Sequence, residues 1–229
     1  LMFVVKYAVT TKRSCPIVGA AIGSISFDSN SINEGDSVIV SGTFSDPALA
    51  VATETFTGQA VWSDGVQTAV SIDGSAGTFT TPRWFLDDDP LTGTPFDLFT
   101  VNITIDDDDL GTDTETSGVL TVNNVAPVIT SFASDATFEN KGQEGEPVQF
   151  DGTFTDVGVL DTHTAEVDWG DGSPPEPLTV VQGAGFGSVS GSHIYASGGV
   201  YTVTLTLTDD DTGTDQSTTL AVITGVGIN

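Results

Sequence analysis

The sequence predicts an all-β protein made of two β-sandwiches in tandem, with an extra strand at its N-terminus. Three observations lead to this prediction. Short segments alternate apolar and polar residues with a period of two, and turns rich in Gly and Asp separate them. No segment shows the apolar stripe of an amphipathic helix. The third observation is an internal repeat, in which three pairs of similar segments follow one another in the same order.

The chain opens with the segment LMFVVKYAV, which predicts a separate strand within residues 1–15. One of its faces is lined by apolar side chains: Leu1, Phe3, Val5, Tyr7 and Val9. Three interpretations stay open: the last strand of a preceding module, a strand that pairs within the first domain, or a strand donated through residues 1–10 to the sheet edge of a neighbouring copy, in a head-to-tail assembly. The segment is too short to span a bilayer, so we expect no membrane insertion.

The repeat defines two homologous domains, predicted at residues 16–125 and 126–229. Three pairs of segments carry it: EGDSVIVSGTFSD from Glu34 and EGEPVQFDGTFTD from Glu144, WSDG from Trp62 and WGDG from Trp169, and FTVNITIDDDDLGTDT from Phe99 and YTVTLTLTDDDTGTDQ from Tyr201. The partners lie 110, 107 and 102 residues apart. The first copy is therefore longer by about eight residues in its middle loops, where insertions are tolerated best.

Each domain has room for about seven short strands in about 100 residues, the number expected of an immunoglobulin-like β-sandwich. The clearest strand segments are predicted at residues 38–44, 101–105, 165–170 and 202–208. Trp62 and Trp169 belong to a central strand, where we expect a large side chain in the core. The Asp-Gly steps that follow them predict hairpin turns rather than ligand loops.

Two segments of the second copy resemble a known family: VDWGDGS at Val167–Ser173 and SHIYASGGVYTVTLTLTDDDTGTD at Ser192–Asp215. Together they resemble the signature of the PKD domain, the immunoglobulin-like module named after the polycystic kidney disease protein. Residues 128–224 are identified as a member of this family, and residues 16–125 as a degenerate copy. Three departures mark that copy: Ser63 replaces Gly170, Arg83-Trp84 stands for His193 and Tyr195, and LDDDPLTGTPFDL intrudes before Phe99.

Two rows of carboxylates, which end the matching strands, are the strongest candidates for a binding site. A hard cation with about six to eight oxygen ligands would relieve their repulsion, and calcium fits better than magnesium. Alternate Asp side chains of a row can meet one ion, and the early Glu-Gly turns and the linker can complete its shell. The predicted Ca²⁺ ligands are Asp107, Asp109, Asp113, Glu34, Asp209, Asp211, Asp215, Glu144 and Asn124. The alternative is an Asp-rich turn that caps its own backbone and binds no metal. Other PKD-like modules bind calcium, which the resemblance adds.

The chain is strongly acidic, with 32 Asp and Glu against 5 Lys and Arg and a net charge of −27. Residues 1–20 carry +3, so the remainder carries −30. Such a field excludes nucleic acid and anionic membranes as partners and attracts cations. Adaptation of the surface to high salt explains the same acidity without any site, and the sequence does not separate the two explanations.

Little in the sequence favours catalysis, and we expect no enzyme. Cys15 is alone, His163 and His193 are too few for a catalytic or metal constellation, and no Ser or Cys nucleophile lies in a recognisable motif. His193 is expected to pack beside Tyr195. The LDDDP segment is interpreted as exposed loop charge, unless another acid lies close to it.

The sequence therefore predicts a non-catalytic structural or adhesive section of an extracellular cell-surface or filament protein. Calcium would stiffen its linker, VNNVAPVIT at residues 122–130, and its partners would be neighbouring copies or modules of the same protein. The extracellular location follows from the family resemblance. The alternative is an accessory module of a secreted enzyme, which would bind polysaccharide or protein through a solvent-facing aromatic strip to which Trp62, Trp84 or Trp169 contributes.

Overall fold

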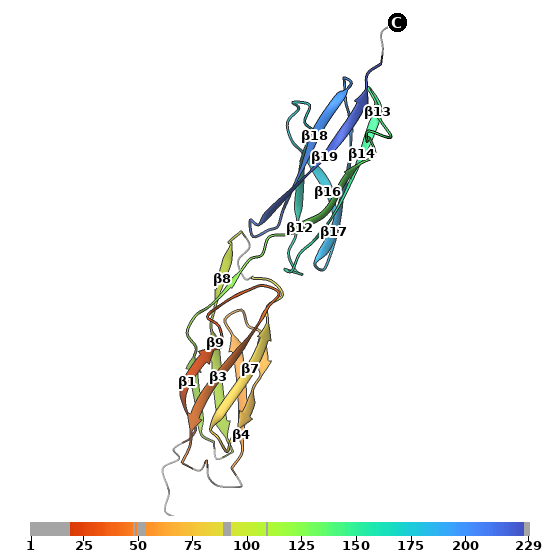
Figure 1. Ribbon diagram of the computed structural model, residues 1–229. Helices are drawn as coiled ribbons and strands as arrows, with labels where there is room; N and C mark the ends of the chain where they lie inside the picture. The colour runs from red at the N-terminus through yellow and green to blue at the C-terminus, as the bar shows by residue number, and fades with distance from the viewer. Residues whose placement is uncertain (1–18, 48, 50–53, 89–92, 109, 227–229) are drawn as a thin grey trace, which may run out of the picture. The chain divides into compact units, whose positions relative to one another are not determined.

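The computed structural model describes residues 19–47, 49, 54–88, 93–108 and 110–226, and every regular element in these ranges is a β-strand (Figure 1). This confirms the all-β fold class. The predicted N-terminal strand, at residues 1–15, lies outside the described residues. The chain divides into two compact units, and each is described by itself. The domain boundaries predicted from the repeat stay predictions.

The first unit comprises Leu1–Asp28, Ile39–Pro82 and Thr100–Gly118. Its strands form two sheets, in the orders β1-β3-β7-β6 and β10-β9-β4-β5. The first sheet contains β1 (Ala21–Phe27), β3 (Ser37–Ser45), β6 (Ser71–Asp73) and β7 (Thr78–Trp84), of which β3 and β7 belong to this unit for most of their length. The second sheet contains β4 (Phe56–Trp62), β5 (Gln67–Ala69), β9 (Val101–Asp107) and β10 (Thr112–Thr116).

The second unit comprises Ser29–Val38, Arg83–Phe99 and Val119–Asn229. A small sheet, ordered β2-β11-β8, contains β2 (Ser31–Asn33), β8 (Phe96–Phe99) and β11 (Leu120–Asn123). A larger one is ordered β12-β14-β17-β16-β15-β18-β19-β13. Its strands are β12 (Val128–Ser134), β13 (Gly142–Gln143), β14 (Pro147–Thr155), β15 (Thr164–Asp168), β16 (Glu176–Gly183), β17 (Phe186–Ile194), β18 (Gly199–Thr208) and β19 (Thr214–Thr224).

Each unit buries one tryptophan, as the sequence predicts. Trp169 is 1% exposed, and its ring lies 5.0 Å from that of Phe150. Val203 of β18 belongs to the same buried cluster. Trp62 is 2% exposed and lies 6.1 Å from the ring of Phe27. The alternation of the strands explains both positions, because every second side chain of a sandwich strand faces the opposite sheet.

The predicted hairpins after the two tryptophans are confirmed. Strand β4 pairs antiparallel with β5, and β15 pairs antiparallel with β16. Gly65 and Gly172 in the two turns both adopt φ of +88°, a conformation that favours glycine.

The match of Arg83-Trp84 to His193 and Tyr195 needs one correction. The N–H of Gly145 donates to the C=O of Tyr195, and the N–H of Gly35 donates to the C=O of Phe85. Phe85, and not Trp84, therefore takes the place of the family tyrosine in the first copy. Trp84 points outward and is 66% exposed.

The same contacts recur in the two sequence copies, which therefore fold alike. Asp113 Oδ2 accepts the N–H of Ile22 at 2.7 Å, and Asp215 Oδ2 accepts the N–H of Ile129 at 2.8 Å. Each of these contacts lies beside a shift in strand register, between β1 and β3 in one copy and between β12 and β14 in the other.

Replacing Trp169 by Ala should lower the free energy of unfolding of the second unit by about 3–5 kcal/mol, because truncation of the buried indole leaves a large cavity. Trp84→Ala in the same unit is the matched control. Its side chain is largely exposed, so the change should stay within about 0.5 kcal/mol. Urea unfolding followed by circular dichroism measures both, and equal losses would contradict the assignment of the core.

Candidate metal centre

The acidic turn after β18 is held by its own carboxylate. Asp209 Oδ1 accepts the N–H groups of Asp211, at 3.0 Å, and of Gly213, at 2.7 Å. In the first copy, Asp107 Oδ1 accepts the N–H of Gly111 at 2.6 Å. One oxygen of Asp209, and one of the matching Asp107, therefore cap the two turns, as the metal-free alternative expects.

Glu34 follows β2 and lies in a turn of the second unit. Gly35, at φ +77°, allows the chain to reverse there. Glu34 is 2% exposed; its Oε1 accepts the N–H of Val125 at 2.6 Å, and its Oε2 has no hydrogen-bond partner among the described residues. Burial raises the pKa of Glu34 to about 7, and the negative charges of Asp156 and Asp87 act in the same direction.

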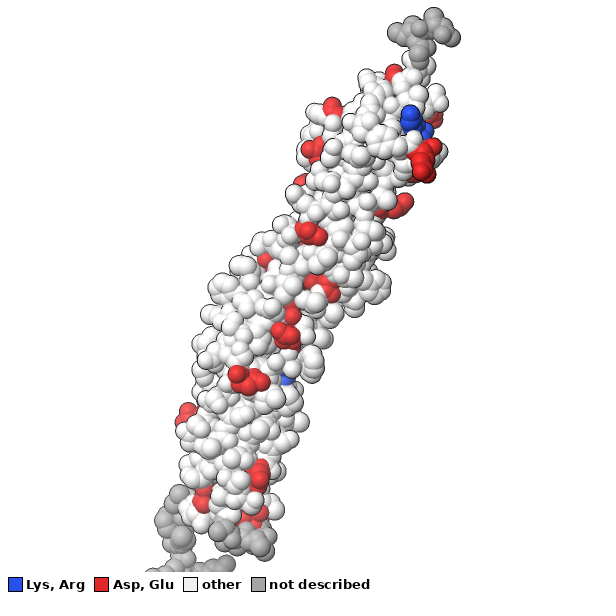
Figure 2. Space-filling model, viewed as in Figure 1, with Lys and Arg blue, Asp and Glu red and all other residues white. Residues whose placement is uncertain are grey.

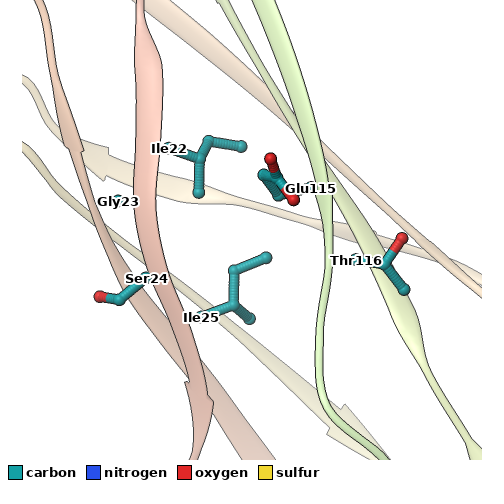
Figure 3. A pocket seen from close by; sticks show the side chains of 6 residues that line it. All are labelled: Ile22, Gly23, Ser24, Ile25, Glu115 and Thr116. Atoms are coloured by element: carbon teal, nitrogen blue, oxygen red, sulfur yellow. The ribbon is translucent and has the colours of Figure 1, made fainter.

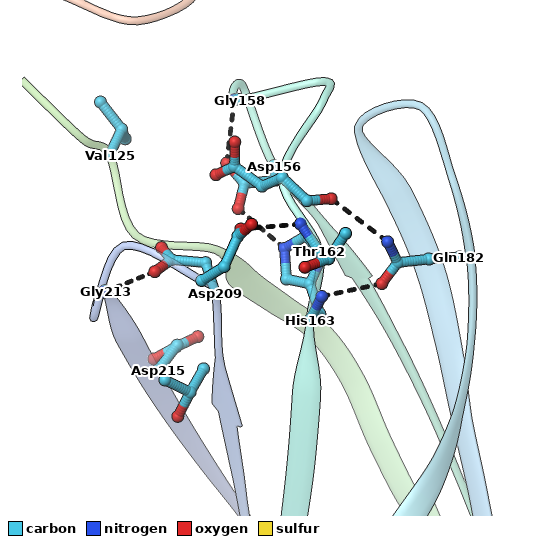
Figure 4. A network of polar contacts seen from close by, with 12 residues as sticks. Val125, Asp156, Gly158, Thr162, His163, Gln182, Asp209, Gly213 and Asp215 are labelled. Carbon is cyan, nitrogen blue, oxygen red and sulfur yellow. Dashed lines mark hydrogen bonds and ion pairs between the residues drawn. The ribbon is translucent and has the colours of Figure 1, made fainter. Parts of the chain in front are cut away.

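The loop between β14 and β15 contributes two more acids (Figure 4). Asp156 Oδ1 accepts the N–H of Gly158 at 3.1 Å, and its Oδ2 lies 2.9 Å from Nε2 of His163. Asp161 is 4% exposed, and neither of its carboxylate oxygens has a hydrogen-bond partner within the described part of the chain. Burial raises the pKa of Asp161 to about 9, and the charge of Glu34 adds to this rise.

Hydrogen bonds from Gln182 and a glycine without a side chain fix the conformation of this loop. Gln182 on β16 donates from Nε2 to the C=O of Asp161 at 3.2 Å, and its Oε1 accepts the N–H of His163 at 2.9 Å. Gly158 leaves room for the Asp161 carboxylate, because an added Cβ would lie 2.4 Å from Oδ2 and 2.5 Å from Oδ1. The Asp161 carboxylate is thus positioned by the shape of the loop rather than by hydrogen bonds of its own.

Glu34, Asp156 and Asp161 form a group that fits one hard cation. One ligand atom from each lies within 4.8 Å of the others, and all three side chains are buried. Calcium binds carboxylate oxygens at about 2.3–2.6 Å, so ligands on opposite sides of the ion are about 5 Å apart. Asn124 has a buried oxygen, Oδ1, without a hydrogen-bond partner in the described ranges, and its Nδ2 donates to Asp209 Oδ2 at 3.1 Å.

A second set of acids meets Glu34 from the loop after β7. One ligand atom each from Glu34, Asp87 and Asp88 lies within 4.8 Å of the others. Burial raises the pKa of Asp88 to about 8, and the charges of Asp211 and Glu34 contribute. The interpretation of LDDDP as exposed loop charge is wrong for Asp88, which is 0% exposed.

The structure brings four of the predicted ligands to this region. Glu34 is a member of both groups. Asp209 and Asp211 are buried close to these groups. The charge of Asp209 contributes to the raised pKa of Asp161, and the charge of Asp211 contributes to that of Asp88. Asn124 is joined to Asp209.

The other predicted ligands lie elsewhere, and metal binding by them stays a prediction. Asp215 caps the N–H of Ile129, and Glu144 Oε2 accepts the N–H of Val226 at 3.2 Å. Two more, Asp107 and Asp113, belong to the first unit. Asp109 lies outside the described residues.

The sequence prediction missed Asp156 and Asp161. Asp156 ends a repeated segment in which Asp46 matches it, so the repeat itself held a signal for this residue. No spacing pattern marks Asp161, which reaches Glu34 only through the fold of its loop.

Two further polar arrangements do not form such a group. A groove of the first unit is lined by Ile22, Gly23, Ser24, Ile25, Glu115 and Thr116, and therefore offers one carboxylate (Figure 3). His193 stacks on Trp169 at 4.8 Å, contacts the ring of Tyr195 at 4.7 Å, and places Nε2 2.8 Å from Asp171 Oδ2. This confirms that His193 packs beside Tyr195.

The fold is that of immunoglobulin-like β-sandwiches, with a buried acidic group in the second unit. Residues 124–224 match the family model of the PKD domain, and this part of the chain is a PKD domain. No curated protein sequence matches the chain. The described residues contain no helix that is long and apolar enough to cross a membrane.

Several solved structures are similar to the chain, all with TM-scores below 0.5. A structure of titin is 13% identical, with 90% of this chain and 99% of that chain covered and a TM-score of 0.41. The Yersinia pseudotuberculosis adhesin InvE is 15% identical, with 86% and 58% covered and a TM-score of 0.38. The glucan-bound SGBP-B of Bacteroides ovatus is 14% identical, with 90% and 47% covered and a TM-score of 0.31. The chain thus spans about half the length of the latter two.

The metal-free protein should lose stability as the pH rises from about 4 to about 9. The folded state holds the protons of Glu34, Asp88 and Asp161 up to about pH 7, 8 and 9, whereas the unfolded chain releases them near pH 4. The folded state therefore binds more protons than the unfolded chain in this interval, and the free energy of unfolding falls as the pH rises. The fall should be steepest between about pH 5 and 7, where all three groups contribute.

Urea unfolding in the presence of a chelator measures this pH profile. The double variant Asp88→Asn, Asp161→Asn cannot titrate at these two positions, so its profile should be flatter. A wild-type stability that increases from pH 5 to 7 would contradict the assignment of buried, protonated carboxylates.

Proposed function

We propose that this chain is a non-catalytic structural or adhesive section of an extracellular surface or filament protein, stiffened by Ca²⁺ at Glu34, Asp156 and Asp161. The observation that carries the proposal is the meeting of these buried carboxylates within 4.8 Å of one another. Glu34 belongs to the first sequence copy, whereas Asp156 and Asp161 belong to the PKD domain. A single ion would therefore tie the two copies together.

Glu34 also holds the linker between the copies. Its Oε1 accepts the N–H of Val125, and its Oε2 is left for a cation. Asn124, the preceding linker residue, donates to Asp209 of the PKD domain. An ion bound to Glu34 would fix the Glu-Gly turn, the linker and the loop of Asp161 as one assembly. Its removal would leave the carboxylates to be neutralised by protons, which do not link the segments, and would loosen all three.

Adaptation to high salt accounts for exposed acids but not for this group. Acidic side chains outnumber basic ones on the face shown in Figure 2. Glu34, Asp156 and Asp161, in contrast, are shielded from solvent, and burial of a carboxylate without compensation is strongly unfavourable. A bound cation offsets this penalty, whereas dissolved salt around the surface does not reach the group.

Calcium is the favoured cation because every ligand on offer is an oxygen. Ca²⁺ accepts about six to eight oxygens in irregular arrangements, whereas Mg²⁺ requires near-octahedral geometry and gives up its waters reluctantly. Extracellular modules commonly bind calcium with dissociation constants of about 0.1–1 mM, which suits the location that the PKD domain implies.

The rival function, a polysaccharide- or protein-binding module of a secreted enzyme, finds less support. It needs a solvent-facing aromatic strip, for which Trp62, Trp84 and Trp169 are the candidates. Trp62 and Trp169 are buried in the cores, so Trp84 alone of the three faces solvent. A head-to-tail assembly through residues 1–10 concerns residues outside the described ranges and stays a prediction.

Calcium titrated into chelator-stripped protein, in at least 150 mM monovalent salt, should bind saturably and raise the melting temperature. Asp161→Asn should weaken this binding by about tenfold or more, because the affinity of such sites depends on the number of charged ligands. Calorimetry and thermal melting measure the two effects.

The matched control is Asp151→Asn, which removes the same charge from an exposed position on β14. It should leave calcium affinity within about twofold, since screened surface charges interact weakly. No binding at about 10 mM calcium, or an equal loss in both variants, would contradict the proposal.

The N–H of Val125 should report the stiffening of the linker. Because it donates to Glu34 Oε1, its hydrogen exchange should slow when calcium fixes Glu34 and should accelerate in chelator. The N–H of Val203, within the β18–β19 pairing, is the control and should change less. Exchange measured by NMR that is identical at Val125 with and without calcium would count against calcium-dependent stiffening.

A further inference from the structure

The cluster of Glu34, Asp87 and Asp88, two of which lie on the loop after β7, has the properties of a separate cation site. Asp88 is 0% exposed, and neither of its oxygens has a hydrogen-bond partner within the described ranges. A ligand atom of Asp88 lies within 4.8 Å of those of Asp87 and Glu34. Asp88 is thus a buried, unpartnered carboxylate that faces two other acids, and the first ion site does not include it.

We propose that Glu34, Asp87 and Asp88 bind a second Ca²⁺, with Glu34 as the bridging ligand between two ions. The inference rests on the proposed function, because both ions share Glu34. A carboxylate has two oxygens and about four lone-pair positions, so it can serve two cations and still accept the N–H of Val125. Two-metal sites place their ions about 3.5–4 Å apart, a spacing that one shared carboxylate can span.

Charge balance favours two ions over one. The described residues of the second unit bury seven acidic side chains: Glu34, Asp88, Asp97, Asp156, Asp161, Asp209 and Asp211. The bases with buried side chains among the described residues are Arg83, whose guanidinium packs 4.1 Å from the ring of Phe85, and His163, whose side chain is 3% exposed and whose Nε2 lies 2.9 Å from Asp156 Oδ2. One divalent cation would offset two of these negative charges, and two cations would offset four.

The chain beyond Asp88 is anchored to the PKD domain. Asp211 Oδ1 accepts the N–H groups of Gly93, at 2.7 Å, and of Thr94, at 3.3 Å. Asp211 and Asp97 also add negative charge around Asp88. Asp88 lies among these acids with neither carboxylate oxygen hydrogen-bonded in the described part of the chain.

The second site also explains the segment that distinguishes the two sequence copies. In the first copy, Phe85 is followed by Leu86, Asp87 and Asp88. In the second copy, Tyr195 is followed by Ala196, Ser197 and Gly198. The acids of the LDDDPLTGTPFDL insertion therefore occur in one copy, next to the Glu-Gly turn whose Glu34 faces the PKD domain.

The test is the calcium stoichiometry of the full chain, measured by calorimetry and native mass spectrometry with calcium as the added metal. Wild-type protein should bind two ions at this centre, Asp88→Asn should bind one, and Asp161→Asn should bind one. Asp151→Asn is the control and should keep both. Circular dichroism and thermal melting of Asp88→Asn in chelator verify that the variant folds.

The outcomes separate this inference from the proposed function. Two ions in the wild type and one in Asp88→Asn support the second site. If the wild type binds one ion, and this ion is kept by Asp88→Asn and lost in Asp161→Asn, the second site is overturned and the proposed function stands. No bound calcium in the wild type overturns both.

Discussion

Carboxylates that are buried close together persist in a folded protein only where protons or cations neutralise them. Protons can neutralise Glu34, Asp88 and Asp161, because burial raises the pKa values of these groups to about 7, 8 and 9. A divalent cation does more than a proton, since it also links segments that are distant in the sequence. The stability of the second unit, and the hold of Glu34 on the linker at Val125, therefore depend on which of the two occupies the group.

The repeated acidic turns are stabilised by their own hydrogen bonds, without any ion. Asp107 and Asp209 cap equivalent turns, which explains the repetition of the acidic row without a metal. The Glu-Gly turns repeat as well: Glu34 accepts the N–H of Val125, and Glu144 makes the matching contact with the chain after β19. In the described structure, the Glu34 turn meets the buried acids of the loop that carries Asp161, and this meeting creates the candidate metal centre.

Local patterns were sufficient to predict the fold, because strand alternation, Asp-Gly hairpins and core tryptophans are properties of short segments. Glu34 could be predicted as a ligand since it opens a repeated segment. Asp161 could not, because it lies 127 residues from Glu34 and no periodic pattern joins the two. The equivalence of Phe85 with Tyr195 likewise required the hydrogen bond from Gly35, since the sequence alone favoured the neighbouring Trp84.

The most direct test of calcium at this centre is diffraction from crystals grown in saturating calcium, at a wavelength where calcium scatters anomalously. A calcium ion at this centre should give an anomalous peak about 2.3–2.6 Å from carboxylate oxygens of Glu34, Asp156 and Asp161. The absence of a peak between these carboxylates would contradict calcium binding at this centre. The side chains would then be protonated and paired with one another, or turned toward solvent.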